Sequence, residues 1–180
     1  AYTLSVGGKE ATGTILDNEA EVKVSSVTSD EKTEGTSLVH TVTMSGVADS
    51  AKTYSFTFAN GTVENEDIGT ISFSNGVTYD STTELITVPA NVTSFTITTP
   101  TNDDALKEDT EAYKIRVGGK EATGTILDNE SDIEVSSVTS DTKTEGTSLV
   151  HTVTMSGAAD SAKTYSFTFA NETVEAEDIG

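Results

Sequence analysis

The fold of this 180-residue chain is decided by the stretch Tyr113-Lys-Ile-Arg-Val-Gly-Gly-Lys-Glu-Ala-Thr-Gly-Thr-Ile-Leu127. Before the Gly118-Gly119 pair, the apolar residues Tyr113, Ile115 and Val117 alternate with charged ones. After the pair, small or apolar residues alternate with threonine and leucine. Alternation of period two on both sides of a glycine turn predicts two antiparallel strands, each with one apolar face.

Part of this stretch occurs twice, and the copy reveals a repeat. Val117 to Asn129 is identical to Val6 to Asn18, and Thr147 to Gly157 is identical to Thr36 to Gly46, each at an offset of 111 residues. Over both overlapping segments, 58 of 69 positions are identical. Self-similarity at a fixed offset is the signature of a repeat array. We therefore expect a window on a longer array, truncated inside a repeat at both ends.

The offset predicts three parts. Residues 1–19 form the C-terminal end of a preceding repeat, residues 20–130 form one complete repeat, and residues 131–180 form the N-terminal part of the following repeat. The complete repeat is long enough to bury a core of its own, whereas the flanking parts are too short. We expect the flanking parts to become ordered only by packing, including end-to-end association between molecules. Protease trimming to a core near residues 20–130 would support this expectation.

Other segments of the repeat also alternate with period two. They include the runs at 38–44, 54–58 and 95–98, with Gly, Asn and Asp between the runs. Seven or more short strands in about 111 residues predict an all-β fold, namely an immunoglobulin-like antiparallel β-sandwich in tandem repeats. The disulfide and buried tryptophan of antibody domains are absent, since the chain has no Cys and no Trp.

The composition excludes several classes of function. The chain carries 30 acidic and 10 basic residues, a net charge of -20. Binding to nucleic acid or to an anionic membrane needs clustered Lys and Arg, which are absent here. No apolar run is long enough to span a membrane, so direct membrane insertion is not expected. No cysteine nucleophile or thiolate metal site is available.

The acidic residues gather in a few places. The complete repeat holds 18 acidic and 7 basic residues, many of them at Glu34, at 64–67, at 103–111 and at 128–130. If the strand at 113–117 and the strand after the Gly-Gly turn are antiparallel, Asp103 and Asp104 can meet Asp128 at the junction with the next repeat. Carboxylates that converge with no nearby Lys or Arg repel one another unless a cation lies among them. Oxygen ligands in irregular loops suit Ca²⁺ better than Mg²⁺. The alternative is a solvated acidic surface, and the spacing alone leaves both open.

The order of these motifs resembles a known kind of domain. Glu34-Gly35, the strand from Leu38 to Ser45, the Asn102-Asp103-Asp104 loop and the segment from Ala122 to Glu130 resemble the Calx-beta type of sandwich. They also resemble the immunoglobulin-like extender repeats of giant bacterial adhesins of the RTX class, which are exported by type I secretion. The resemblance covers the whole 111-residue unit.

The resemblance implies a set of Ca²⁺ ligands and a function. The metal ligands would be Glu34, Asp67, Asp103, Asp104, Glu108, Glu111 and Asp128, with Glu130 in the terminal acidic cluster. Each repeat would be a rod segment of a secreted adhesin on the surface of a bacterium, supporting cell adhesion or biofilm formation. Ca²⁺ would stiffen the junctions, and the partners would be neighbouring repeats.

The sequence leaves other functions open. The unit could be a calcium-responsive regulatory module, or a repeat that itself binds a sugar or self-associates, for which Tyr79 is the one candidate aromatic platform. An enzyme is not expected, because His40 has no second histidine in its repeat and no Gly-x-Ser-x-Gly elbow occurs. We expect His40 to be a structural residue.

Overall fold

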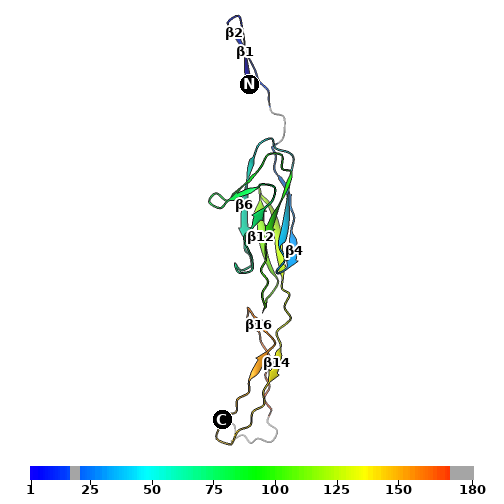
Figure 1. Ribbon diagram of the computed structural model, residues 1–180, viewed down its shortest axis with the longest axis vertical. Coiled ribbons are helices and arrows are strands. Elements are labelled where there is room, and N and C mark those ends of the chain that lie inside the picture. Colours follow the sequence, from blue (N-terminus) through cyan, green and yellow to red (C-terminus); the bar gives the residue numbers. More distant parts are fainter. Residues whose placement is uncertain (17–20, 171–180) are drawn as a thin grey trace.

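The computed structural model describes residues 1–16 and 21–170, and Figure 1 shows an elongated molecule with a sandwich at its centre. The described residues contain strands and no helix, so the predicted all-β sandwich is confirmed. Among them, no helix is long and apolar enough to cross a membrane.

Two sheets make up the sandwich. In the first, the strand order is β3 (Val24–Val27), β5 (Leu38–Met44), β10 (Ser94–Thr99) and β7 (Ser72–Phe73). In the second, the order is β4 (Asp30–Thr33), β13 (Lys120–Leu127), β12 (Glu111–Val117), β6 (Lys52–Ala59), β9 (Leu85–Val88) and β8 (Thr78–Asp80). The decisive stretch forms the antiparallel hairpin β12–β13 at the centre of the second sheet, as its alternation predicted.

Within the two sheets of the sandwich, one strand pair departs from the predicted antiparallel arrangement. β4 pairs with β13 in parallel, from Asp30 opposite Gly124 to Thr33 opposite Leu127. The sequence Asp30-Glu-Lys-Thr33 has no apolar alternation, so its place in the sheet depends on the tertiary fold rather than on a local pattern. The parallel pairing means that β4 and β13 end at the same end of the sandwich.

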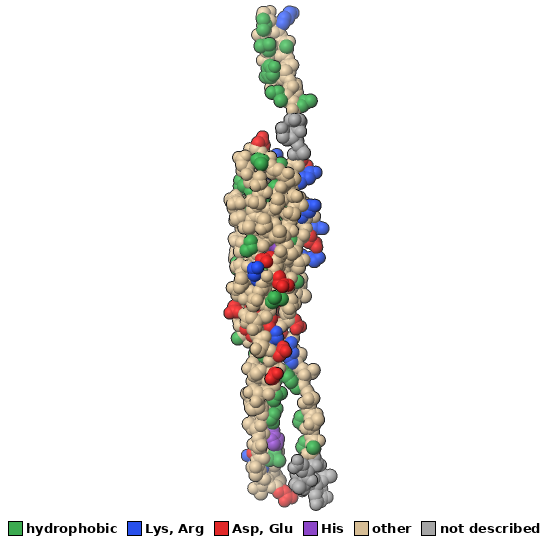
Figure 2. Space-filling model, turned by 90° about the vertical axis from the view of Figure 1, so that its right-hand side faces the viewer, with side chains coloured by type: hydrophobic (Ala, Val, Ile, Leu, Met, Phe, Trp, Pro, Cys, Tyr) green, Lys and Arg blue, Asp and Glu red, His purple; other side chains and the backbone are tan. Residues whose placement is uncertain are grey.

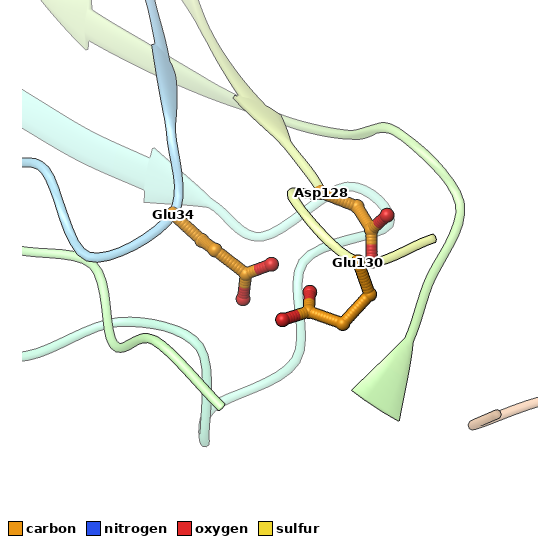
Figure 3. A group of neighbouring side chains, drawn as sticks. All are labelled: Glu34, Asp128 and Glu130. Carbon is orange, nitrogen blue, oxygen red and sulfur yellow. The ribbon is translucent and has the colours of Figure 1, made fainter. Parts of the chain in front are cut away.

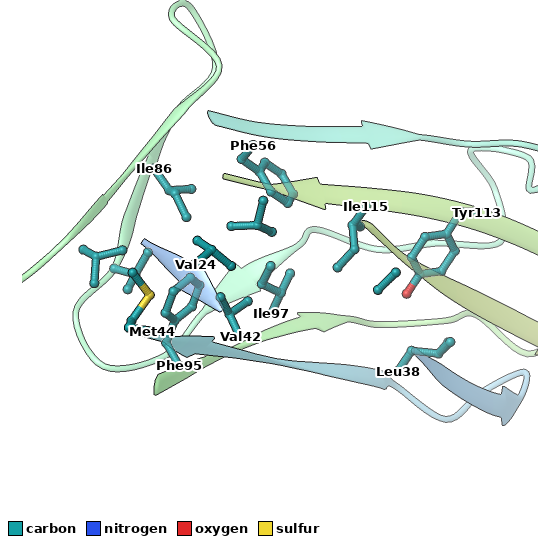
Figure 4. Close-up of a cluster of buried hydrophobic side chains, with 14 of the residues drawn as sticks. Val24, Leu38, Val42, Met44, Phe56, Ile86, Phe95, Ile97, Tyr113 and Ile115 are labelled. Carbon is teal, nitrogen blue, oxygen red and sulfur yellow. The ribbon is translucent and has the colours of Figure 1, made fainter. Parts of the chain in front are cut away.

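The core lies between the sheets and follows the predicted alternation. On β5, Leu38, His40, Val42 and Met44 are buried, while the residues between them point outward. The central hairpin contributes several more of the buried side chains in Figure 4. The buried apolar residues are Val24, Leu38, Val42, Met44, Phe56, Val63, Val77, Ile86, Val88, Phe95, Ile97, Tyr113, Ile115, Val117, Ala122 and Ile126.

His40 is a structural residue, as predicted. Its Nδ1 lies 2.8 Å from the Thr28 carbonyl oxygen, and its Nε2 lies 2.8 Å from the Tyr113 hydroxyl oxygen. Because a carbonyl can only accept, Nδ1 donates, and Nε2 accepts from Tyr113. Burial lowers the pKa of His40 despite its bond to Thr28. The imidazole is therefore a neutral link between the two sheets.

Tyr79 lies on an outer strand and is 41% exposed. Its ring packs edge-on against Phe56, with ring centroids 5.1 Å apart, and lies 6.0 Å from the ring of Phe73. The residue is thus part of an aromatic cluster at the margin of the core.

Two further pieces extend beyond the sandwich at opposite ends (Figure 1). At one end is the hairpin of β1 (Tyr2–Val6) and β2 (Lys9–Gly13). At the other end β14 (Val135–Val138) pairs with β15 (Val153–Met155). Hydrophobic side chains lie open along both pieces in Figure 2. The assignment of these pieces to separate repeats stays a prediction.

Candidate metal centre

The acidic residues converge because of strand register. Thr33 and Leu127 are the last partners of the parallel β4–β13 pair, so Glu34 and Asp128 follow at the same end of the sandwich. The Glu34 amide donates to the Leu127 carbonyl oxygen at 2.9 Å, which fixes the two chain segments side by side. Glu111 begins β12 opposite Ile126 and therefore lies at this end too.

Glu34, Asp128 and Glu130 form the first carboxylate group. One oxygen from each lies within 4.8 Å of those of the other two. In Figure 3 the carboxylates of Glu34 and Glu130 face each other, with Asp128 beside them. Glu34 is only 7% exposed and accepts from the Asn129 amide at 3.2 Å. Burial and the nearby Glu130 nevertheless raise the pKa of Glu34 to about 7.

Asp67, Glu108 and Glu111 form the second group, again with one oxygen from each within 4.8 Å of the others. Burial, followed by the nearby carboxylates of Asp67 and Asp104, raises the pKa of Glu108 to about 7. Burial and the contact with Asp67 raise the pKa of Glu111 to about 8. The group thus holds negative charge only at a cost, because water is partly excluded and like charges are close.

A lysine lies beside the first group, contrary to the expectation that no cation is near. Lys107 Nζ pairs with the Asp128 carboxylate, whose side chain is 5% exposed. The Glu108 amide also donates to Asp128 Oδ1 at 2.7 Å. Burial would raise the pKa of Asp128, but Lys107 and this amide outweigh it and lower the pKa. Asp128 therefore carries its charge in the fold and links the two groups through the 103–111 loop.

Asp103 and Asp104 lie outside both groups and hold the loops around them. Asp103 Oδ1 accepts from the Asn129 side-chain amide at 2.7 Å. Its Cβ would lie 2.9 Å from a Cβ added at Gly35, whose φ is +72°, so the loops approach closely there. Asp104 Oδ1 accepts from the Leu106 amide at 2.7 Å. Each of these oxygens thus accepts a hydrogen bond that shapes the site.

The carboxylate oxygens of the two groups are arranged as ligands for a hard cation. Glu111 and Glu130 each have one buried carboxylate oxygen, Oε2, without a hydrogen-bond partner among the described residues. Buried polar atoms are nearly always paired, so an unpaired carboxylate oxygen needs a proton or a cation. Six carboxylates, five on loops and Glu111 at the start of β12, supply the oxygen ligands that Ca²⁺ takes. These residues could therefore hold Ca²⁺.

The following segment of the chain also reaches this end of the sandwich. β11 (Leu106–Lys107) pairs in parallel with β16 (Ala158–Ala159), and the Asp160 amide lies 3.4 Å from the Lys107 carbonyl oxygen. Asp160 adds to the negative field at Glu108. The loop that carries Lys107 and Glu108 therefore contacts the segment that follows the sandwich.

Sequence reasoning missed three features of the site. It did not separate the carboxylates into two groups, and it gave no role to Lys107 or Asn129. The position of Lys107 between Asp104 and Glu108 was a usable signal, since the one cation in an acidic loop is attracted by whichever carboxylates the fold brings near it. The role of Asn129 depends on the approach of β13 to the 103–111 loop.

No known protein family matches the chain, and no curated protein matches it. Among solved structures, the chain is similar to one from a type I cohesin–dockerin complex of Clostridium thermocellum. The TM-score is 0.37 at 13% identity, and the similarity covers 60% of this chain and 100% of that chain. At that TM-score the similarity carries no weight for function.

Proposed function

We propose that each 111-residue unit is a structural extender segment of a secreted adhesin on a bacterial surface, stiffened by Ca²⁺ where units join. The observation that carries this proposal is the position of the two carboxylate groups. Both lie at the end of the sandwich from which the chain continues into the next copy of the repeat. The near-identity of the copies also favours a mechanical role, because a rod gains length from repetition.

Ca²⁺ at this position would act on the junction directly. In the first group, Glu34 comes from the start of the unit, whereas Asp128 and Glu130 come from its last residues. A cation bound to all three would tie the segment leaving the sandwich to its body. In the absence of the cation, repulsion among the carboxylates would favour movement of that segment. Regular junctions would then produce a stiff rod that holds a distal binding domain away from the cell.

Thermal unfolding of the 180-residue chain with Ca²⁺ and with a chelator tests the metal site. A ligand that binds only the folded state stabilises it by about 2.7 kcal/mol at 100 times its Kd, on the order of 10 °C in Tm for a domain of this size. We expect Glu34→Gln and Glu111→Gln each to reduce the shift. Glu121→Gln serves as the control, because Glu121 lies near the Gly-Gly turn at the other end of β13. The absence of any Ca²⁺-dependent shift would refute the site.

Small-angle scattering on the same samples tests the stiffening. We expect the profile with chelator to show a flexible ensemble and the profile with Ca²⁺ to show one extended shape. If Ca²⁺ raises Tm but leaves both profiles equally flexible, the metal site stands and the stiffening is wrong.

A further inference from the structure

The chain contains four tripeptides of the form Asn-x-Ser/Thr, for which the function proposed above has no role. They begin at Asn60, Asn91, Asn129 and Asn171. This tripeptide is the acceptor for N-linked sugar, which is attached to the asparagine side chain. In a threonine-rich chain such tripeptides also arise by chance, so the structure has to distinguish among them. Asn171 lies outside the described residues, and the surroundings of the other three are described.

The first acceptor tripeptide is engaged in contacts of the fold. Asn60 follows β6 and is half-buried, and its side-chain nitrogen donates to Asn65 Oδ1 at 3.0 Å. The hydroxyl of Thr62, the third residue of the tripeptide, accepts from the Ala112 amide at 2.9 Å. Gly61 lies so close to the neighbouring strand that an added Cβ would be 2.1 Å from the Ala112 carbonyl oxygen. Neither polar side chain of this tripeptide is therefore available for modification.

The tripeptide at Asn129 lies between the acidic loops. The Asn129 side-chain nitrogen donates to Asp103 Oδ1 at 2.7 Å, and its backbone amide donates to Glu34 at 3.2 Å. The middle residue of the tripeptide, Glu130, belongs to the first carboxylate group. A sugar on the Asn129 nitrogen would stand where the 103–111 loop meets the end of β13, and it would disturb the contact that holds the loop there.

The tripeptide at Asn91 is open to solvent. Asn91 lies in the turn between β9 and β10, and both Asn91 and Thr93, the third residue of the tripeptide, are exposed. Within the described part of the chain, neither side chain has a hydrogen-bond partner. Val92 between them packs against the core. The apolar middle residue thus anchors the turn, while its two polar side chains remain accessible.

The turn at Asn91 is held through its main chain. Asn91 has a φ of +64°, a conformation that asparagine adopts more readily than most residues. Its amide donates to the Ala48 carbonyl oxygen at 2.9 Å, and the Thr93 carbonyl oxygen accepts from the Met44 amide at 2.8 Å. Because these bonds involve backbone atoms, a sugar on the Asn91 side chain would break no contact of the fold.

The same turn lies at the end of the sandwich away from the carboxylate groups. Ser94, which begins β10, lies opposite Thr43 near the end of β5. The other end of β10 leads into the 100–105 loop, which borders the carboxylate groups. A sugar at Asn91 would therefore leave both carboxylate groups uncovered.

We propose that Asn91 is an N-glycosylation site and that Asn60 and Asn129 are not modified. In the transfer, the side-chain nitrogen of Asn91 forms a bond to the anomeric carbon of a sugar and gives up one proton. The bond from that carbon to the phosphate of the donor breaks, so the donor is a sugar activated as a nucleotide or lipid phosphate ester. The attached sugar adds bulk and hydration to the turn.

The test is mass spectrometry of the protein isolated from the cells that naturally produce it. Cleavage after glutamate separates the three asparagines, because Asn60 falls in the peptide 35–64, Asn91 in 85–108 and Asn129 in 122–130. We expect the mass of one or more sugar units on the 85–108 peptide and on neither of the other two. An amidase that removes N-linked sugar should then leave an aspartate at position 91.

Two substitutions at one residue provide a matched pair. Thr93→Val removes the hydroxyl of the acceptor tripeptide and should abolish the modification, although Asn91 itself is unchanged. Thr93→Ser keeps the hydroxyl and should retain the modification. Asn60→Gln and Asn129→Gln should leave the sugar in place. An unmodified 85–108 peptide in the wild-type protein, or sugar on either of the other peptides, would overturn the proposal.

The readout is separate from that of the metal proposal, because a sugar is detected by mass and Ca²⁺ by its effect on Tm. Asn91→Gln removes the acceptor nitrogen at the end of the sandwich remote from the carboxylates. The Ca²⁺-dependent shift in Tm should therefore be the same in Asn91→Gln as in the wild type. A shift that differs between them would contradict the placement of the sugar away from the carboxylate groups.

Discussion

Tyr113 joins several of the contacts that hold the sandwich together. Its ring stacks on Phe58 with centroids 4.7 Å apart, its hydroxyl donates to His40 across the core, and its flat side covers Gly124 on the paired strand. Burial raises the pKa of this tyrosine to about 12, so the hydroxyl stays protonated as a donor. The absence of a side chain at residue 124 is what lets a large ring lie flat inside a sheet.

Gly124→Ala should therefore destabilise the folded chain, although it adds only a methyl group and removes no hydrogen-bonding group. A Cβ at this position would lie 2.2 Å from the Tyr113 ring, so the ring or the strand must shift, at a cost of about 1–3 kcal/mol. Gly46→Ala is the matched control, since its nearest neighbour would be Val22 at 4.0 Å. Urea unfolding should show a lower midpoint for Gly124→Ala at an unchanged slope. Equal midpoints for the two variants would contradict this account.

At the scale of elements, the end of the sandwich depends on a loop held by one lysine. Lys107 lies in the short strand β11. Its side chain pairs with buried Asp128, and its backbone lies opposite Ala159 in the parallel β11–β16 pair. The loop thus reaches both the last residues of the sandwich and the segment that follows them. A buried carboxylate that loses its cation is costly, because its charge remains with little solvent around it.

Lys107→Met should lower the Tm of the chain in chelator. Ca²⁺ should then raise Tm by more than it does in the wild type, because a divalent cation can neutralise Asp128 in place of the ammonium group. Lys114→Met is the control, since Lys114 pairs with exposed Glu121 on the outer face of the hairpin and surface pairs contribute little. A Lys107→Met chain with wild-type Tm in chelator would show that Asp128 does not need this partner.

The elements that the sequence could predict are those with a strong local pattern. The alternating burial of β5, β12 and β13 was visible in the order of apolar residues. β4 and β11 were not visible, because each is short and mostly polar and pairs only through contacts distant in sequence. For the site, the strand order explains why Glu34 and Asp128 meet, whereas the separation into two groups depends on loop conformation.

At the scale of the whole molecule, part of the net charge of -20 comes from carboxylates that are partly buried and close to one another. The raised pKa values of Glu34, Glu108 and Glu111 mean that the folded chain holds protons which the unfolded chain releases near pH 4.5. Between about pH 4.5 and 8 the folded state thus binds more protons than the unfolded state. Rising pH then reduces stability in this window.

Without Ca²⁺ the chain should accordingly be more stable near pH 5.5 than near pH 8. Glu111→Gln should weaken this dependence, because the amide stays neutral throughout. Asp30 and Asp128, whose pKa values are lowered, should act in the opposite direction only under more acidic conditions. Unfolding in chelator across this pH range measures the effect, and a stability that rises from pH 5.5 to 8 would contradict it.

The parallel pairing of β4 and β13 has a consequence for mechanical load. β4 comes early in the sandwich and β13 is its last strand, so tension applied along the chain on either side of the sandwich pulls the two strands in opposite directions along their common axis. The hydrogen bonds between them run across that axis and are strained together rather than opened one at a time, as they would be at the end of a hairpin. Force on the chain therefore meets this strand pair in shear, the loading geometry in which a short run of paired residues resists separation best.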